Sequence, residues 1–245
     1  MSNVVIFGST SAMAQETARI YAARGARISL LARDHEKNEI VAADLKARGA
    51  ADVFTHTVDA LEFERHEEVW QDVLREQGRV DVVLIAHGSL SDQSACQAKY
   101  PEAEREYQIN FLSFVSFLTP VANQFETEKQ GCIAVISSVA GDRGRQSNYI
   151  YGSAKAGLSA FLSGLRNRLS KSNVHVLTIK PGFVATPMTA HLDQGPLFVA
   201  PSVVAKGIVR AIDRRRDIVY LPFFWRWIML IIVSIPERIF KRLGL

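Results

Sequence analysis

Cysteine is scarce in this chain, which contains only Cys96 and Cys132 among its 245 residues. Their number and spacing fit neither a disulfide framework nor a zinc site, and they agree with a reducing compartment. The six histidines are dispersed without the spacing of metal ligands, and no Gly-x-Ser-x-Gly segment marks a hydrolytic serine. We therefore expect no metal site, and we exclude metal-dependent hydrolysis and hydrolysis by a serine elbow.

A long hydrophobic run is also missing. A helix that crosses a bilayer needs about 20 mainly apolar residues, whereas the apolar stretch at residues 227–235 is shorter and ends before Pro236 and Glu237. The N-terminus has no basic segment ahead of an apolar one, so we expect no secretory signal and a cytoplasmic location. The net charge is only +4, and we do not expect nucleic acid as a partner.

The chain does have the composition of a globular domain. Hydrophobic residues make up 48% and charged residues 22%, without a low-complexity tract or an internal repeat. No break in composition divides residues 1–222, which we expect to form one domain. Residues 223–245 form an apolar and basic C-terminal extension, and the eight basic and three acidic side chains of residues 210–245 account for the net positive charge.

Short β-rich apolar segments alternate with longer helical patterns over the first three quarters of the chain. This alternation predicts parallel strands joined by helices that cover both faces of one sheet. We expect an α/β fold of the Rossmann type, with a doubly wound sheet of seven parallel strands. The expected strands are Asn3–Phe7, Ala26–Leu31, Val53–Thr57, Val80–Ala86, Cys132–Ile136, Val174–Lys180 and Ile218–Leu221.

A turn of small residues follows the first strand and opens a helix expected over Met13–Arg24. Small side chains let the backbone approach a pyrophosphate, and a helix N-terminus favours negative charge. Ala12 and Ala14 stand where the usual dinucleotide fingerprint has its later glycines. On this turn alone, cofactor binding and an ordinary strand-to-helix turn are equal alternatives. The turn reads Gly8-Ser9-Thr10-Ser11-Ala12-Met13-Ala14.

The end of the second strand bears on the choice of nicotinamide cofactor. An acidic residue here would hold the ribose 2′-hydroxyl of NAD, whereas an arginine would pair with the 2′-phosphate of NADP. The residues present are Arg33 and Asp34. We expect Arg33 to face the ribose and therefore favour NADP(H). NAD(H) stays open, because Asp34 could face the ribose while Arg33 is a solvated loop charge.

Tyr151 and Lys155 are one helical turn apart, so both side chains can reach one site. A nearby ammonium stabilises a phenolate, and we expect Lys155 to lower the phenol pKa from its usual value of about 10. Chance also produces such pairs on exposed helices. Ser138 strengthens the interpretation, because it follows the strand Cys132–Ile136 and could donate to a developing alkoxide while Tyr151 delivers the proton. Asn110 completes the candidate set.

These residues resemble the classical short-chain dehydrogenase/reductase family over residues 1 to about 220. The resemblance implies an NAD(P)-dependent oxidoreductase with Ser138, Tyr151 and Lys155 as its catalytic core. It also implies that Asn110 holds a water linking Lys155 to solvent, and that Lys155 contacts the nicotinamide ribose. The residues implied in cofactor binding are Gly8, Ser9, Thr10, Ser11, Ala12, Met13, Arg33, Asp59, Ala60, Ala86, His87, Gly88, Tyr151, Lys155, Pro181, Gly182, Val184 and Thr186.

Three of these segments have implied roles. Asp59 is similar to the adenine-contacting residue of the family, residues 86–88 to its Asn-Ala-Gly segment, and residues 181–186 to its nicotinamide-side loop. His87 departs from the usually small residues of its segment and could narrow or polarise the cofactor pocket. We assign His87 no catalytic role, since a packing or loop histidine is more usual.

Two apolar stripes follow helical spacing. We expect both to be core, with pairing of their outer edges against a second subunit as the alternative. We also expect a homo-oligomer, either a dimer or a tetramer. The stripes are Phe111, Phe114, Val115 and Leu118, and Leu158, Phe161, Leu162, Leu165 and Leu169.

The C-terminal extension combines aromatic, apolar and basic residues. Trp225 and Trp227 flank the start of an apolar stretch that is followed by Arg238, Lys241 and Arg242. This pattern suits a peripheral segment in a membrane interface, which would hold the protein at the inner face of a membrane. A buried helix at the pocket rim or at a subunit contact is the equal alternative.

Residues 141–149 and the Phe-Trp-Arg-Trp tail resemble the reductases that act on decaprenylphosphoryl-2-keto-ribose. This resemblance implies a lipid-linked keto-sugar as the carbonyl substrate. Arg143 and Arg145 would then meet its phosphate, and solvated loop charges are the alternative. Two other functions stay open: reduction of a hydrophobic ketone such as an acyl chain or steroid, and a non-catalytic nucleotide-sensing membrane scaffold. The intact candidate catalytic set argues against the scaffold.

Overall fold

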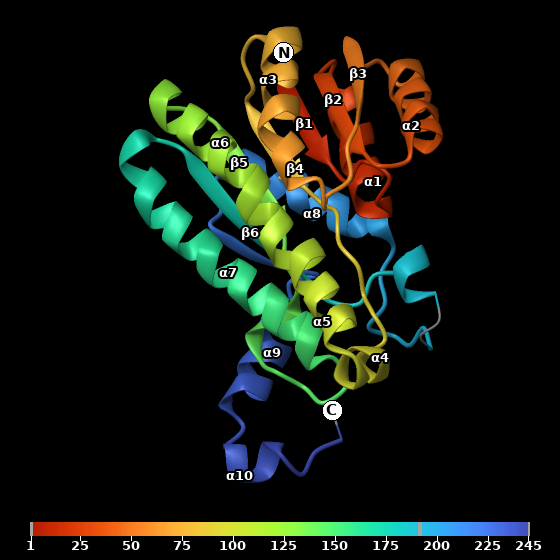
Figure 1. Cartoon of the computed structure of the whole chain (residues 1–245), viewed down its shortest axis with the longest axis vertical. Helices are drawn as coiled ribbons and strands as arrows, with labels where there is room; N and C mark the ends of the chain where they lie inside the picture. Colours follow the sequence, from red (N-terminus) through yellow and green to blue (C-terminus); the bar gives the residue numbers. More distant parts are fainter. Residues whose placement is uncertain (1, 191–192, 245) are drawn as a thin grey trace.

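The computed structural model describes residues 2–190 and 193–244, and these contain one seven-stranded sheet (Figure 1). Its strand order is β3-β2-β1-β4-β5-β6-β7, and every neighbouring pair is parallel. The predicted doubly wound parallel sheet is thus confirmed. The strands are β1 (Asn3–Phe7), β2 (Arg27–Ala32), β3 (Asp52–Thr57), β4 (Val82–Ile85), β5 (Cys132–Ile136), β6 (His175–Pro181) and β7 (Ile218–Leu221).

All seven predicted strands are present, and their ends differ from the prediction by at most two residues. The largest difference is at β4, which begins at Val82 rather than Val80. Asp81 lies just ahead of it and accepts a hydrogen bond from the main-chain N–H of Asn3 at 2.9 Å. β1, β4 and β5 are almost wholly buried, because helices cover both faces of the sheet.

Three helices pack on each face of the sheet (Figure 1). Val4 and Ile6 of β1 face one apolar cluster, and Val5 and Phe7 face the other, as alternation along a strand requires. On the first face lie α1 (Ala12–Ala22), α2 (His35–Ala47) and α8 (Pro201–Asp213). On the second lie α3 (His66–Gln77), α6 (Ser113–Glu128) and α7 (Tyr149–Leu169).

The two predicted apolar stripes are mostly core. Phe114 and Leu118 of α6 and four leucines of α7 are buried in the second cluster. Phe111 and Phe161 are only partly buried beside it. The helix predicted at Met13–Arg24 is α1, which ends two residues earlier, at Ala22.

A continuous helical segment leads into the site from the edge of the molecule. After α4 (Gln93–Ala98), α5 (Tyr100–Tyr107) runs through a π-helical turn (Gln108–Leu112) into α6. A π turn changes the direction of side chains within a helix and often occurs at a functional site. The described 3-10 turns are Phe63–Arg65, Val139–Asp142, Ser170–Ser172 and Pro187–Thr189.

The C-terminal extension folds as two short helices, α9 (Trp225–Ser234) and α10 (Glu237–Phe240), which lie beyond the ends of α5 and α7 (Figure 1). Trp225 and Met229 are buried against Val139, so α9 has a small apolar core of its own. Within residues 2–190 and 193–244, each helix is too short or too polar to cross a membrane.

Candidate active site

The turn after β1 is pressed against the segment after β4. Gly8 has φ +86°, and a Cβ atom placed on it would lie 2.4 Å from the main-chain nitrogen of His87. The Gly8 N–H also donates to the carbonyl oxygen of Leu31 at 2.8 Å. Only glycine meets both requirements, because other residues rarely adopt positive φ and all carry a Cβ. β1 and β4 are neighbouring strands at the point where the strand order reverses, and doubly wound sheets bind ligands at such a point.

One predicted site residue of this turn, Ser9, lies outside the cavity lining. The Ser9 hydroxyl donates to Asn38 Oδ1 at 2.6 Å, and the Ser9 N–H donates to the Leu31 carbonyl oxygen at 3.2 Å. Ser9 is therefore buried behind the turn, and its role in cofactor binding stays a prediction. The rest of the turn borders a cavity, and Ala14 is fully buried below it. The methyl group of Ala14, at the last position of the fingerprint, therefore packs in the core.

Asp34 and Arg33 have separate surroundings. Asp34 caps α2, accepting from the Lys37 main-chain N–H at 3.0 Å, and its carboxylate lies 2.8 Å from Lys37 Nζ. These interactions with Lys37 lower the pKa of Asp34. Arg33 is exposed and borders the cavity. Asp59 and Ala60, which follow β3, also border the cavity. Arg33 is therefore the residue available to a ligand at this end.

His87 has its ring in the core. The ring lies 4.4 Å from Phe7 and 4.2 Å from Phe114, measured between ring centroids, and its Nε2 is 2.7 Å from Ser113 Oγ. Burial and the Lys155 charge lower its pKa well below the usual value, so the ring is neutral. We had expected that His87 could narrow or polarise the pocket. His87 lines the cavity together with Ala86 and Gly88, and its ring packs between Phe7 and Phe114.

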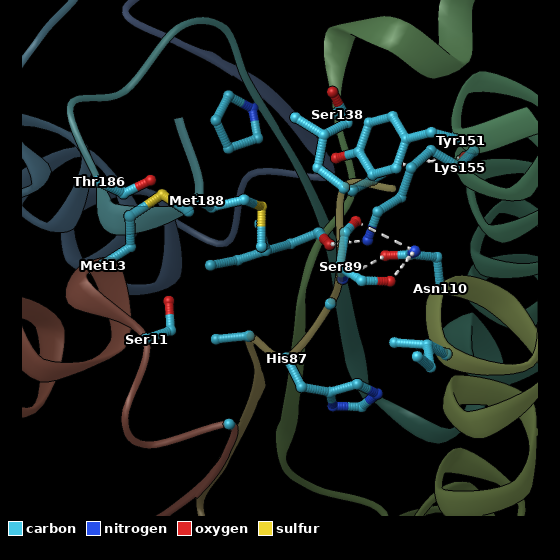
Figure 2. Close-up of a pocket in the computed structure, with 18 of the residues that line it drawn as sticks. Ser11, Met13, His87, Ser89, Asn110, Ser138, Tyr151, Lys155, Thr186 and Met188 are labelled. Atoms are coloured by element: carbon cyan, nitrogen blue, oxygen red, sulfur yellow. Dashed lines mark hydrogen bonds between the residues drawn. The ribbon is translucent and has the colours of Figure 1, made fainter. Parts of the chain in front are cut away.

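The three catalytic candidates converge from two elements (Figure 2). Tyr151 and Lys155 project from the first part of α7, and Ser138 follows β5. Two glycines allow this approach. A Cβ on Gly141 would lie 2.7 Å from the Lys155 carbonyl carbon, and a Cβ on Gly152 would lie 2.9 Å from the Ala140 carbonyl oxygen. No sequence pattern had indicated a packing role for either glycine.

The ionisation of the pair differs from our expectation. Burial lowers the pKa of Lys155 to about 7, with the charge of Glu106 acting in the opposite direction. Burial raises the pKa of Tyr151 to about 12, although hydrogen bonding with Ser138 lowers it. We had expected Lys155 to make the phenol more acidic. In the protein alone burial dominates, and Tyr151 is held as a neutral proton donor.

Asn110 is fully buried in the π-helical turn between α5 and α6. Its Nδ2 donates to the Ser89 carbonyl oxygen at 3.2 Å and to a Glu106 carboxylate oxygen at 2.6 Å. A Cβ on Gly88 would lie 2.8 Å from Asn110 Oδ1 and 3.7 Å from Lys155 Nζ, so both side chains reach Gly88. Glu106 was not among the predicted site residues, although its spacing of four residues from Asn110 was a usable signal.

The loop after β6 closes the other side of the cavity. Pro181, Gly182, Val184 and Thr186 all line it. A Cβ on Gly182 would lie 1.9 Å from Trp225 Nε1, so the loop is in direct contact with α9. The C-terminal extension therefore packs on the pocket rim, which was one of the two alternatives for it.

Arg143 and Arg145 have different surroundings. Arg143 donates to the carbonyl oxygens of Val233 and Ile235, at 2.8 and 2.7 Å, and to the Glu237 carboxylate at 2.8 Å. It therefore holds the extension in place and is not available to a substrate phosphate. Arg145 lines the cavity, and within the described residues its buried Nε has no hydrogen-bond partner. Burial lowers the pKa of Arg145, yet a guanidinium stays charged.

A cavity of about 550 Å³ connects these groups (Figure 2). Every predicted site residue except Ser9 lines it. It extends from Arg33 to Lys155 past the turn after β1. These features fit a dinucleotide. Among the described residues, no group of three or more His, Cys, Asp or Glu side chains could hold a metal ion.

Comparisons with known proteins identify the family of this chain. Residues 2–196 match the short chain dehydrogenase family. An uncharacterised oxidoreductase of Mycobacterium tuberculosis is 36% identical over 240 residues, which cover 98% of this chain and 96% of the relative. Since the family match and this relative both span most of the chain, they establish the family.

Two solved structures share the fold. A short-chain dehydrogenase from Sphingobium yanoikuyae in complex with NADPH has a TM-score of 0.83 and 24% identity, covering 97% of each chain. An alcohol dehydrogenase from the archaeon Thermococcus sibiricus, complexed with 5-hydroxy-NADP, has a TM-score of 0.78 and 22% identity, covering 90% of this chain and 95% of that one. The protein therefore belongs to the short-chain dehydrogenase family and is an NAD(P)-dependent oxidoreductase.

Proposed function

We propose that this protein reduces the carbonyl group of a lipid-linked, phosphate-bearing keto-sugar with NADPH. The observation that carries the reaction class is the convergence of Ser138, Tyr151 and Lys155 on one cavity wall (Figure 2). The bound nicotinamide supplies the hydride. The hydroxyl of Tyr151 donates the proton to the carbonyl oxygen, and the hydroxyl of Ser138 donates a hydrogen bond to the same oxygen.

The main-chain contacts of Ser138 leave its proton free for this role. Its Oγ accepts a hydrogen bond from the Ala140 N–H at 3.1 Å, which orients the oxygen without using the hydroxyl proton. Lys155 donates to the Ile136 carbonyl oxygen at 3.2 Å and has further protons for ribose hydroxyl groups. Reduction requires a protonated Tyr151, and its raised pKa ensures that form at neutral pH.

The proposed preference for NADPH rests on Arg33, because Asp34 is engaged by Lys37 as a helix cap. A guanidinium can pair with the 2′-phosphate that NADH lacks. We expect Arg33→Gln to weaken NADPH binding about tenfold, with NADH binding nearly unchanged. Fluorescence titration with both cofactors measures this. Equal weakening for the two would refute the assignment.

The proposed phosphate on the substrate rests on Arg145, a charged group that lines the cavity with a buried and unpartnered nitrogen. Such a group favours an anionic ligand, since leaving a buried donor unpaired is unfavourable. Arg145→Gln should raise KM about tenfold or more for a polyprenyl-phosphoryl keto-pentose. It should leave KM for a neutral ketone within about twofold. Equal effects on both substrates would refute the phosphate contact.

The proposed membrane contact rests on the exposed side of the extension. Phe223 is 75% exposed, Trp227 58% and Ile231 67%, and the basic Arg238 and Arg242 are exposed nearby. Exposed aromatic and apolar groups beside basic ones suit an anionic membrane interface. We expect flotation with phosphatidylglycerol vesicles, which is lost with phosphatidylcholine vesicles or in Trp227→Ser/Ile231→Ser. Unchanged flotation of that variant would refute the contact.

Reduction of a hydrophobic ketone is the second candidate, supported by the apolar Phe183, Val184 and Met188 in the cavity wall. A panel of carbonyl compounds separates the candidates: NADPH oxidation with the keto-sugar supports the first, and oxidation with only acyl or steroid ketones supports the second. Cofactor binding without turnover on any carbonyl would instead favour a nucleotide-sensing scaffold.

We also propose a homo-oligomer that pairs through α6 and α7. Phe111 and Phe161 are only partly buried, and Leu112 is 44% exposed beside them. Apolar residues at the outer edge of two long helices can extend a core across a two-fold axis. Light scattering after gel filtration should give the mass of a dimer or tetramer. A monomer at micromolar concentration would refute this proposal.

A further inference from the structure

A buried carboxylate lies next to the site without a role in the proton transfer described above. Glu106 of α5 is 1% exposed. Its carboxylate accepts hydrogen bonds from Asn110 Nδ2 at 2.6 Å, from Ser89 Oγ at 2.9 Å and from Ser91 Oγ. All three donors are neutral. A buried carboxylate is unfavourable even when hydrogen-bonded, so its presence at this position calls for a compensating role.

Asn110 bridges the space between this carboxylate and Lys155. Its Nδ2 faces Glu106, while its Oδ1 accepts from the Ser89 N–H at 3.3 Å. That Oδ1 and Lys155 Nζ both lie near Gly88, where a Cβ would be 2.8 and 3.7 Å from them. Figure 2 shows Asn110 beside Ser89 and close to the end of Lys155. The three side chains thus form one row, from α5 through the π-helical turn to α7.

Among the described titratable groups that face Lys155, Glu106 provides the negative charge. Burial lowers the pKa of Lys155 to about 7, and the Glu106 charge counteracts this. The other titratable groups that face Lys155 are Tyr151 on α7 and His87 after β4, and both are neutral near pH 7. The charge of Arg145 lowers the pKa of Tyr151, and Arg145 lies on the cavity side.

We propose that Glu106 is a positioning residue of the active site, which fixes the amide of Asn110 and provides the counter-charge for the Lys155 ammonium. The proposal rests on the proposed function, since the ammonium matters only if Lys155 holds the ribose and assists Tyr151. Glu106 touches neither substrate nor cofactor and acts through Asn110 and through its charge.

A charge-neutral variant separates this role from simple packing. Glu106→Gln keeps the size of the side chain and an oxygen that accepts from Asn110, but it removes the charge. Glu104→Gln is the matched control, because it removes the same charge from an exposed position on the same helix. Glu106→Asp retains the charge on a shorter side chain.

The direct test is the titration of Lys155 in the protein without cofactor, followed by 15N NMR of lysine Nζ and assigned with Lys155→Met. We expect Glu106→Gln to lower the Lys155 midpoint by on the order of one pH unit, while Glu104→Gln leaves it unchanged. Glu106→Asp should titrate like the wild type. An unchanged midpoint in Glu106→Gln, or an equal shift in Glu106→Asp, would overturn the proposal.

A second readout uses turnover. The alkaline limb of the kcat/KM profile for carbonyl reduction should move to lower pH in Glu106→Gln by the same amount as the NMR midpoint. A uniform loss at all pH values, without a shift of the limb, would show that Glu106 only supports the fold. The NMR titration needs no substrate, so failure of the proposed reaction and failure of this inference are distinguishable.

Discussion

The ammonium of Lys155 donates a hydrogen bond to the carbonyl oxygen of Ile136, the last residue of β5, at 3.2 Å. This bond joins α7 to the carboxyl edge of the sheet at the point where Ser138 leaves it. The same ammonium is buried beneath the cavity. Lys155 therefore contacts the sheet on one side and lines the cavity on the other.

Burial of Lys155 should lower the stability of the protein near neutral pH. Its pKa is lowered from 10.5 to about 7, so between these values the unfolded chain binds more protons than the folded one. The free energy of unfolding contributed by this group therefore rises with pH from about 7 to about 10.5. Lys155→Met should be more stable than the wild type at pH 7, and the difference should shrink by pH 9.5. Urea unfolding at both pH values tests this, and a difference independent of pH would contradict it.

Gly8→Ala should be strongly destabilising. The substitution introduces a methyl group 2.4 Å from the His87 nitrogen at φ +86°. We expect a loss of more than about 2 kcal/mol in the free energy of unfolding and loss of cofactor binding. Gly25→Ala is the control, because it has φ +71° but nothing within 4 Å, and it should cost only about 1 kcal/mol. Equal losses in the two variants would show that the contact with His87 is unimportant.

Arg143→Ala should release the C-terminal extension. This substitution removes the hydrogen bonds to Val233 and Ile235, the ion pair with Glu237, and the stacking of the guanidinium over Phe240 at 3.9 Å. We expect trypsin to cleave within residues 226–242 about tenfold faster than in the wild type. Arg214→Ala is the control, because it removes an exposed arginine outside the extension and leaves every tryptic site in residues 226–242 in place. Unchanged cleavage in Arg143→Ala would mean that other contacts hold the extension.

Gly182→Ala should disturb both the loop that lines the pocket and the C-terminal extension that packs on this loop. The added methyl group would overlap the ring of Trp225, with Nε1 at 1.9 Å. We expect a loss of about 1–3 kcal/mol in stability and a raised KM for the carbonyl substrate. Trp225→Ala in the same chain makes room for the methyl group, so the two stability losses should not add. Strict additivity would refute the contact as the cause.

The sheet could be predicted from the sequence because its buried strands are short, mainly aliphatic runs between turn residues, as in Val82–Ile85. The catalytic set was equally accessible, since Tyr151 and Lys155 are one helical turn apart and Ser138 follows a strand. These features depend on local spacing, which the sequence displays directly.

The remaining features depend on contacts between distant segments. Arg143 binds the extension about 90 residues later in the chain, and the Ser9 hydroxyl binds Asn38. The raised pKa of Tyr151 follows from its burial, which the spacing of Tyr151 and Lys155 does not show. The role proposed for Glu106 depends on the π-helical turn, which places Asn110 next to Gly88. Apart from the four-residue spacing of Glu106 and Asn110, these features have no local pattern in the sequence.

The central claim is that the Tyr151 hydroxyl delivers the proton to the substrate carbonyl. The most direct measurement is single-turnover oxidation of NADPH by Tyr151→Phe, with the carbonyl compound that the wild type reduces fastest. We predict a fall of at least about 100-fold, while NADPH binding stays within about threefold of the wild type. A variant that reduces the carbonyl at a rate close to that of the wild type would contradict the account.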